Sequence, residues 1–171
     1  MNHETNLPAS IKVTKPTIVE DTRKFFISYK KDSAFDLAKH VYDGLNERGV
    51  EVFLDEIDVE KGLTKKEWQK QIDDAVEQAQ VILLIMTNGA SNSSGVKREL
   101  RLARKDENKK IFAFIDNSIW NEEGETTIVI RRKKISVKDY QVSRFDAQRP
   151  ESLLREVCAS ARVVRAYKPS I

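Results

Sequence analysis

The run Val81-Ile82-Leu83-Leu84-Ile85-Met86 carries the strongest structural signal in the sequence. Its six apolar residues follow one another without polar alternation, which is typical of a β-strand that is covered on both faces. A strand of this kind lies near the centre of a sheet that has helices on either side. We therefore expect the flanking sequence to supply helices and further buried strands.

Strands and helices alternate around this central run. The other predicted strands are residues 24–29, 50–54, 111–115 and 140–145. Apolar residues at helical spacing predict a helix after each of the first three strands and another after the last strand. Thr64 and Glu67 form the sequence pattern of a capping box at the start of the second helix, and Pro150 is suited to begin the last helix.

Residues 116–139 show less regular patterning than the rest of the chain. They contain the basic run Arg131-Arg132-Lys133-Lys134, which we interpret as a solvated loop or an edge strand. Trp68 and Trp120 are the two tryptophans, and the helical spacing of Trp68 predicts a core position.

The alternation predicts an α/β protein, namely a flavodoxin-like three-layer domain. Its centre is a mostly parallel five-stranded sheet with helices on both faces. We place the domain at residues 24–167, between a flexible N-terminal tail, residues 1–23, and a C-terminal tail, residues 168–171. Ligands of such sheets bind at the carboxyl ends of the strands. The segments expected to meet there are residues 29–33, 55–62 and 87–99.

Composition narrows the classes of function. The 171-residue chain has 30 basic and 27 acidic residues, and a net charge of +3 favours neither nucleic acid nor an anionic membrane as a partner. Val81–Met86 is too short to span a membrane, and residues 1–10 lack an apolar signal sequence. Cys158 is the single cysteine, so no intramolecular disulfide can form. We therefore expect a cytoplasmic protein.

Glu99 is the residue that the sequence singles out for chemistry. Its neighbours three and four positions away on the predicted helix are Gly95, Val96, Leu102 and Ala103. None of them is charged, so Glu99 has no helical ion-pair partner, and it lies at the margin of an apolar face. Partial burial would raise the pKa of such a carboxyl group. Two interpretations stay open: a site residue in a cleft, or a glutamate that reaches solvent or pairs with a distant lysine.

Three sequence boxes resemble the TIR (Toll/interleukin-1 receptor) domain family. Phe25-Phe26-Ile27-Ser28-Tyr29 with Asp32 resembles the first box. Val52-Phe53-Leu54-Asp55, followed by a loop that ends at Gly62, resembles the second strand and the BB loop, which we define as Asp55–Gly62. Ser93–Leu100 resembles the third box, in which Gly95 stands where the family has tryptophan. Trp120 is a candidate for a substitute aromatic surface.

The resemblance implies an enzyme that cleaves the nicotinamide–ribose bond of NAD+. The products would be ADP-ribose or a cyclic ADP-ribose-type signal, and Glu99 would be the catalytic residue. The residues implied for substrate binding are Phe26, Ser28, Tyr29, Lys30, Lys31, Asp55, Gly62 and Gly95. Each of these also has a structural interpretation, as core, loop bracing or a solvated lysine. NAD+ would be the substrate, with no cofactor, and neither His3 nor His40 belongs to a metal-ligand cluster.

The resemblance also implies a role in innate immune or antiviral defence signalling, with self-assembly through the BB loop. Other TIR proteins or a downstream effector are further expected partners. An alternative function is a non-enzymatic TIR adaptor that signals by homotypic assembly. A flavodoxin-like receiver domain ranks last, because Tyr29-Lys30-Lys31 follow the first strand where receivers place paired acids.

Overall fold

The computed structural model describes residues 21–164, and its centre is a five-stranded parallel sheet. The strands are β1 (Lys24–Ser28), β2 (Glu51–Phe53), β3 (Val81–Met86), β4 (Lys110–Asp116) and β7 (Gln141–Phe145), in the order β2-β1-β3-β4-β7. Every residue of β3 is buried, and this strand pairs with β1 on one side and β4 on the other. The predicted central position of Val81–Met86 is therefore confirmed.

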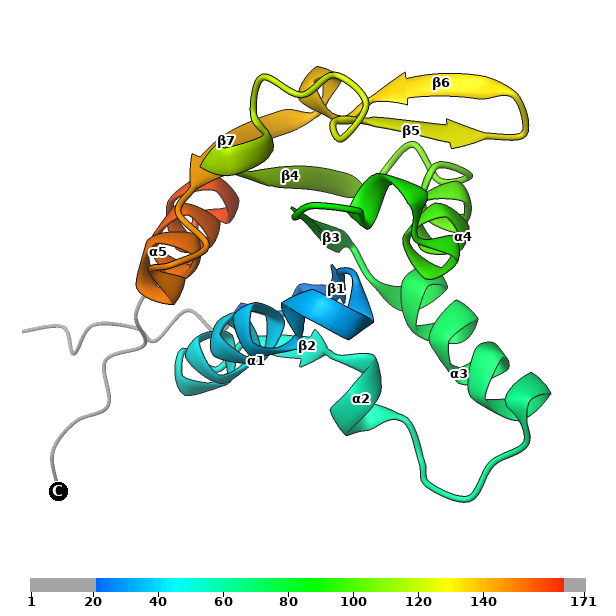
Figure 1. The fold of residues 1–171 in the computed structure, drawn as a ribbon. Helices are drawn as coiled ribbons and strands as arrows, with labels where there is room; N and C mark the ends of the chain where they lie inside the picture. Colours follow the sequence, from blue (N-terminus) through cyan, green and yellow to red (C-terminus); the bar gives the residue numbers. More distant parts are fainter. Residues whose placement is uncertain (1–20, 165–171) are drawn as a thin grey trace, which may run out of the picture.

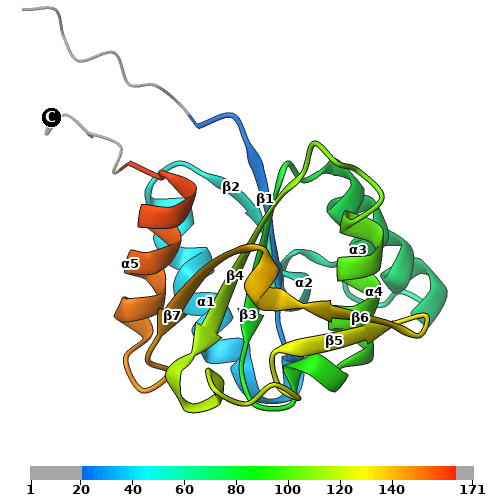
Figure 2. The ribbon, with the colours of Figure 1, turned by 90° about the horizontal axis from the view of Figure 1, so that it is seen from above.

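Helices cover both faces of the sheet (Figures 1 and 2). One face carries α1 (Lys31–Glu47) and α5 (Pro150–Ala161), and the other carries α3 (Lys65–Gln78) and α4 (Ser94–Ala103). The short helices are α2 (Asp55–Asp58), η1 (Ala90–Asn92), η2 (Asn117–Ile119) and η3 (Val137–Asp139). The predicted three-layer α/β architecture is confirmed.

Local sequence signals explain several boundaries of these helices. Thr64 and Glu67 form the predicted capping box: the Glu67 amide donates to Thr64 Oγ1 at 3.2 Å, and the Thr64 amide donates to Glu67 Oε2 at 3.0 Å. Pro150 occupies the first turn of α5, as expected. These signals account for the residues at which α3 and α5 begin.

Residues 116–139 are more regular than the sequence indicated. They form an antiparallel hairpin of β5 (Thr127–Ile130) and β6 (Lys133–Ser136), which is a separate two-stranded sheet. Each strand has only four residues, too short for a clear periodic signal, and Ile128 pairs with a buried Ile135. Figure 2 shows the hairpin lying across α4, with which β5 makes contacts.

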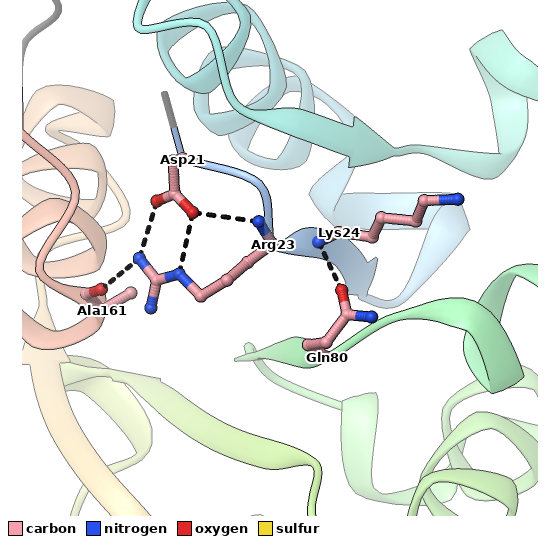
Figure 3. A network of polar contacts seen from close by, with 5 residues as sticks. All are labelled: Asp21, Arg23, Lys24, Gln80 and Ala161. Carbon is pink, nitrogen blue, oxygen red and sulfur yellow. Dashed lines mark hydrogen bonds and ion pairs between the residues drawn. The ribbon is translucent and has the colours of Figure 1, made fainter. Parts of the chain in front are cut away.

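The start of the described chain is attached to the domain (Figure 3). The Arg23 guanidinium donates to Asp21 Oδ2 at 2.7 Å and to the carbonyl oxygen of Ala161 at 2.8 Å, which links this segment to the end of α5. The Lys24 amide donates to Gln80 Oε1 at 2.6 Å. Residues 1–20 of the predicted N-terminal tail and the whole predicted C-terminal tail, residues 168–171, lie outside the described residues, as do residues 165–167 at the end of the predicted domain.

Candidate functional site

Glu99 lies at the carboxyl ends of the central strands, beside the change of direction in strand order between β1 and β3. It is on α4, and only 3% of it is exposed. Ser28, the last residue of β1, donates its hydroxyl hydrogen bond to Glu99 Oε1 at 3.0 Å. This pair, separated by 71 positions in sequence, joins two of the predicted boxes in space.

The position of Glu99 follows from the face on which α4 packs. Ser93 caps the helix by accepting a bond from the Val96 amide at 3.3 Å. Val96, Leu102 and Ala103 are all buried, and Glu99 shares their face of the helix. The pattern that predicted a partly desolvated carboxyl group therefore holds, and the burial is nearly complete.

Burial raises the pKa of Glu99 from its ordinary value of 4.5 to about 8. The nearby positive charge of Lys31 and the Ser28 hydrogen bond lower the pKa, whereas the negative charge of Asp55 raises it. Desolvation is the largest of these effects. The carboxyl group is consequently protonated for the most part at neutral pH when the cleft holds no ligand.

Asp55 anchors the beginning of the BB loop. Its side chain is 3% exposed, accepts a hydrogen bond from Tyr29 Oη at 2.8 Å and pairs with Lys31 Nζ at 2.5 Å. Burial and the neighbouring Asp55 raise the pKa of the Tyr29 hydroxyl, so this group remains a hydrogen-bond donor. Tyr29 and Asp55 thus brace the second segment against the first.

A cleft of about 660 Å³ opens beside Glu99. Its walls come from the starts of α1, α3 and α4 and from the β5–β6 hairpin. Six lysine or arginine residues and two acidic residues line it. The excess of basic residues in the lining therefore favours an anionic substrate over a cationic one. The two acidic residues of the lining are Asp32 and Glu99.

Gly95 precedes Glu99 by one helical turn and has no side chain that could cover the Glu99 carboxyl group. A Cβ atom at Gly95 would lie 3.7 Å from Glu99 Oε2, the oxygen that Ser28 does not contact. Glycine therefore leaves space on the cleft side of this oxygen. Because residue 95 is glycine, this chain lacks the aromatic ring that the TIR third box has at this position.

Trp68 lines the cleft, although the sequence predicted a core position for it. Trp68 is partly buried against the hydrophobic cluster that includes Ile72 and Val76 of α3. Lys31 Nζ lies 4.1 Å from the centroid of its ring. Trp120 instead packs in the cluster beneath η2, where Lys138 and Arg144 cover its ring. Helical periodicity identified the inner face of Trp68 and gave no sign that its outer edge faces a cleft.

The predicted substrate-binding residues divide into three groups. Lys31 and Gly95 line the cleft with Glu99. Ser28 and Asp55 contact the lining residues Glu99 and Lys31, respectively, and Tyr29 donates a hydrogen bond to Asp55.

Three others lie elsewhere. Phe26 is buried and stacks on Phe53 with ring centroids 5.5 Å apart, Gly62 has a φ of +81° in an exposed loop, and Lys30 lines a separate cleft of about 640 Å³. The two lysines diverge because α1 begins between them, at Lys31.

No group of three or more histidine, cysteine, aspartate or glutamate side chains in residues 21–164 is arranged to hold a metal ion. None of the helices in that part of the chain combines the length and the apolar character that crossing a membrane requires.

The sequence profile of the TIR domain matches residues 25–154, which include all the segments that form the site. The chain belongs to the TIR domain family. Glu99 lies within the matched residues of this TIR domain, and its catalytic role stays a prediction. No curated protein matches the sequence.

The solved structures that are similar to this TIR domain include the following two. The CMP N-glycosidase BcmB of Clostridium botulinum has 15% sequence identity and a TM-score of 0.54, over 80% of this chain and 98% of that one. The TIR domains of the activated Roq1 resistosome, which recognises the pathogen effector XopQ, have 15% identity and a TM-score of 0.48, over 56% of this chain and 58% of that one. The first similarity supports the α/β fold described above.

Proposed function

We propose that this TIR domain is an N-glycosidase that cleaves the nicotinamide–ribose bond of NAD+. The observation that carries the proposal is the Glu99 carboxyl group, buried at the base of a cationic cleft and hydrogen-bonded by Ser28 on one oxygen. Gly95 leaves space beside the other oxygen, on the cleft side. A carboxylate with one oxygen held by Ser28 and the other beside Gly95 of the cleft lining suits contact with a ribose.

The reaction needs one carboxylate and little else from the protein. The bond between C1′ and the pyridinium nitrogen breaks, its electron pair stays with the nitrogen, and nicotinamide leaves as a neutral molecule. The ribose then has oxocarbenium character, which an ionised Glu99 stabilises electrostatically. Water adds at C1′ and loses a proton, which gives ADP-ribose. Attack by the adenine of the same substrate would instead give a cyclic product.

The charge of the substrate suits the raised pKa of Glu99. A pyridinium cation beside the carboxyl group favours its ionised form and therefore lowers its pKa. A substrate with a neutral base offers no such assistance, and its leaving group requires protonation. The carboxyl group, with a pKa of about 8, is thus poised to lose its proton when a cationic nicotinamide ring enters the cleft.

Trp68 supplies an aromatic surface within the same cleft. Its position on α3 differs from that of the missing third-box tryptophan, which would stand at residue 95 on α4. The Trp68 ring already accepts the Lys31 ammonium group on one face. We propose that the ring also packs against the bound substrate and takes over part of the role of the absent side chain.

The test compares substrates of different charge. Concentrated protein is incubated with NAD+ and, separately, with CMP, because the structural relative BcmB is a CMP N-glycosidase. The released bases are separated by chromatography, and the sugar products are identified by mass. Nicotinamide and ADP-ribose, or its cyclic form, are expected from NAD+. Release of cytosine alone would reassign the substrate, and the absence of both reactions in a crowded solution would favour the adaptor.

The adaptor remains the second candidate, and one observation favours assembly. Ile57, on the α2 segment of the BB loop, is 41% exposed and so offers an apolar side chain to a partner. We propose that the BB loop, Asp55–Gly62, contacts another TIR domain, either a second copy or a signalling partner. Ile57→Glu should reduce concentration-dependent assembly in analytical ultracentrifugation. The exposed substitution Glu107→Gln is the control, and equal assembly of both variants would count against the BB loop.

A further inference from the structure

The β5–β6 hairpin forms one wall of the Glu99 cleft. Val129, Ile130 and Arg131, from the end of β5 and the turn that follows, line the same cleft as Glu99. Figures 1 and 2 show the hairpin extending from the β7 side of the molecule across α4. The turn thereby brings a basic segment, 32 positions after Glu99 in the sequence, to the site.

The basic residues of the cleft outnumber its acidic ones, and only some of them are paired within the described part of the chain. Lys31 is paired with Asp55, and Arg98 is paired with Asp73. The other basic lining residues form no salt bridge with any residue of 21–164; they are Lys65, Lys97, Arg101 and Arg131. Asp73 also lies near enough to interact with Arg101. An excess of positive charge gathered in a concave surface favours the binding of an anion.

Arg101 supplies a second observation that points to an anionic ligand. Its Nε atom is buried and has no hydrogen-bond partner among residues 21–164. A buried guanidinium donor without an acceptor is costly, so its presence calls for an explanation. An anionic group bound in the cleft that Arg101 lines would supply one.

The turn of the hairpin is conformationally unusual. Arg131 has a φ of 48° and Arg132 a φ of 67°, so two successive arginines adopt the left-handed region. Two-residue hairpin turns of this kind favour Asn and Gly, which tolerate positive φ. Strained residues of this type concentrate at functional sites, and Arg131 lines the cleft whereas Arg132 does not.

We propose that Arg131, with Lys65, Lys97 and Arg101, forms a phosphate subsite in the cleft. The subsite selects phosphorylated nucleosides, and in particular the diphosphate bridge of a dinucleotide, over unphosphorylated ribosides. This inference rests on the proposed function for its substrate. It assigns phosphate recognition to the hairpin, in place of Lys30, which lines a different cleft.

The first experiment measures binding and does not require turnover. Inorganic pyrophosphate is titrated into the full chain and into the variants Arg131→Asn and Arg132→Asn, with calorimetric detection. Asparagine suits the left-handed turn, so both variants should melt at or above the wild-type temperature. Arg131→Asn should weaken pyrophosphate binding about 5- to 10-fold, and more so at low salt, whereas Arg132→Asn should change it less than about twofold. Equal effects of the two substitutions would overturn the subsite.

The second experiment uses catalysis to separate the two proposals. With NAD+, Arg131→Asn should raise KM about 5- to 10-fold and leave kcat unchanged, since an interaction equal in the ground and transition states is lost. With nicotinamide riboside, which has no phosphate, the same variant should behave as wild type. Pyrophosphate binding through Arg131 without NAD+ cleavage would retain the subsite and reject the proposed function. If Arg131→Asn leaves NAD+ cleavage unaltered, the proposed function is retained and the phosphate subsite is rejected.

Discussion

Glu99→Gln should stabilise the folded protein, and the gain should grow with pH. The pKa of Glu99 is about 8 in the folded protein and 4.5 in its ordinary state. Between these values the unfolded chain loses the proton while the folded chain keeps it, so ionisation favours unfolding as pH rises. Glutamine cannot ionise, and its carbonyl oxygen can still accept the Ser28 hydrogen bond. The variant is therefore free of this penalty.

The magnitude follows from the two pKa values. Each pH unit inside this window removes about 1.4 kcal/mol of stability from the wild type, so the advantage of Glu99→Gln should grow by about 2 to 3 kcal/mol between pH 5 and pH 7. For a chain of this size, that difference corresponds to roughly 5 to 10 °C in Tm. The penalty is complete above pH 8, where both states are ionised.

Urea unfolding at pH 5, 6 and 7 measures the effect, with circular dichroism as the probe. The exposed substitution Glu107→Gln removes one negative charge outside the cleft lining and serves as the control. An advantage of Glu99→Gln that is the same at all three pH values would show that the Glu99 pKa is not raised. The explanation of the site by desolvation would then be wrong.

Three further substitutions test the surroundings of Glu99. Ser28→Ala removes a hydrogen bond that lowers the Glu99 pKa, so the pH of half-maximal NAD+ cleavage should move upward in a rate profile; an unchanged profile would contradict this contact. Asp55→Asn breaks a buried ion pair with Lys31 and should lower the free energy of unfolding by about 2 to 4 kcal/mol in urea titrations, whereas a loss below about 0.5 kcal/mol would show that the pair is not structural. Trp68→Ala should raise KM for NAD+ about tenfold, and Trp68→Phe should recover most of it; equal kinetics of both variants would exclude a stacking role.

Much of the architecture could be predicted from local patterns. The uninterrupted apolar run Val81–Met86 is typical of a strand with both faces covered, and in the structure it forms the central strand, β3. The capping box at Thr64 depends on residues three positions apart, so it is visible in sequence. The convergence of the three segments followed from the rule that the carboxyl ends of parallel strands share one edge.

The features that could not be predicted from the sequence depend on contacts between segments that are distant in the chain. The uncharged helical neighbours of Glu99 indicated desolvation, but its actual partner, Ser28, is 71 positions away. The hairpin was missed because its strands are four residues long and its turn consists of arginines in place of Asn-Gly. Trp68 has an inner face with helical periodicity, and only the packing of α1 and α4 shows that its outer edge lines a cleft.

The central claim is that Glu99 cleaves NAD+, and nicotinamide release measures this most directly. Wild type, Glu99→Ala and Glu99→Gln are incubated with NAD+ at high protein concentration and with a crowding agent, and free nicotinamide is quantified over time. Melting curves establish that all three proteins are folded. We expect release by the wild type and a loss of at least about 100-fold in both variants, because the developing charge on the ribose is no longer stabilised. Equal release by the three proteins would contradict the assignment of Glu99.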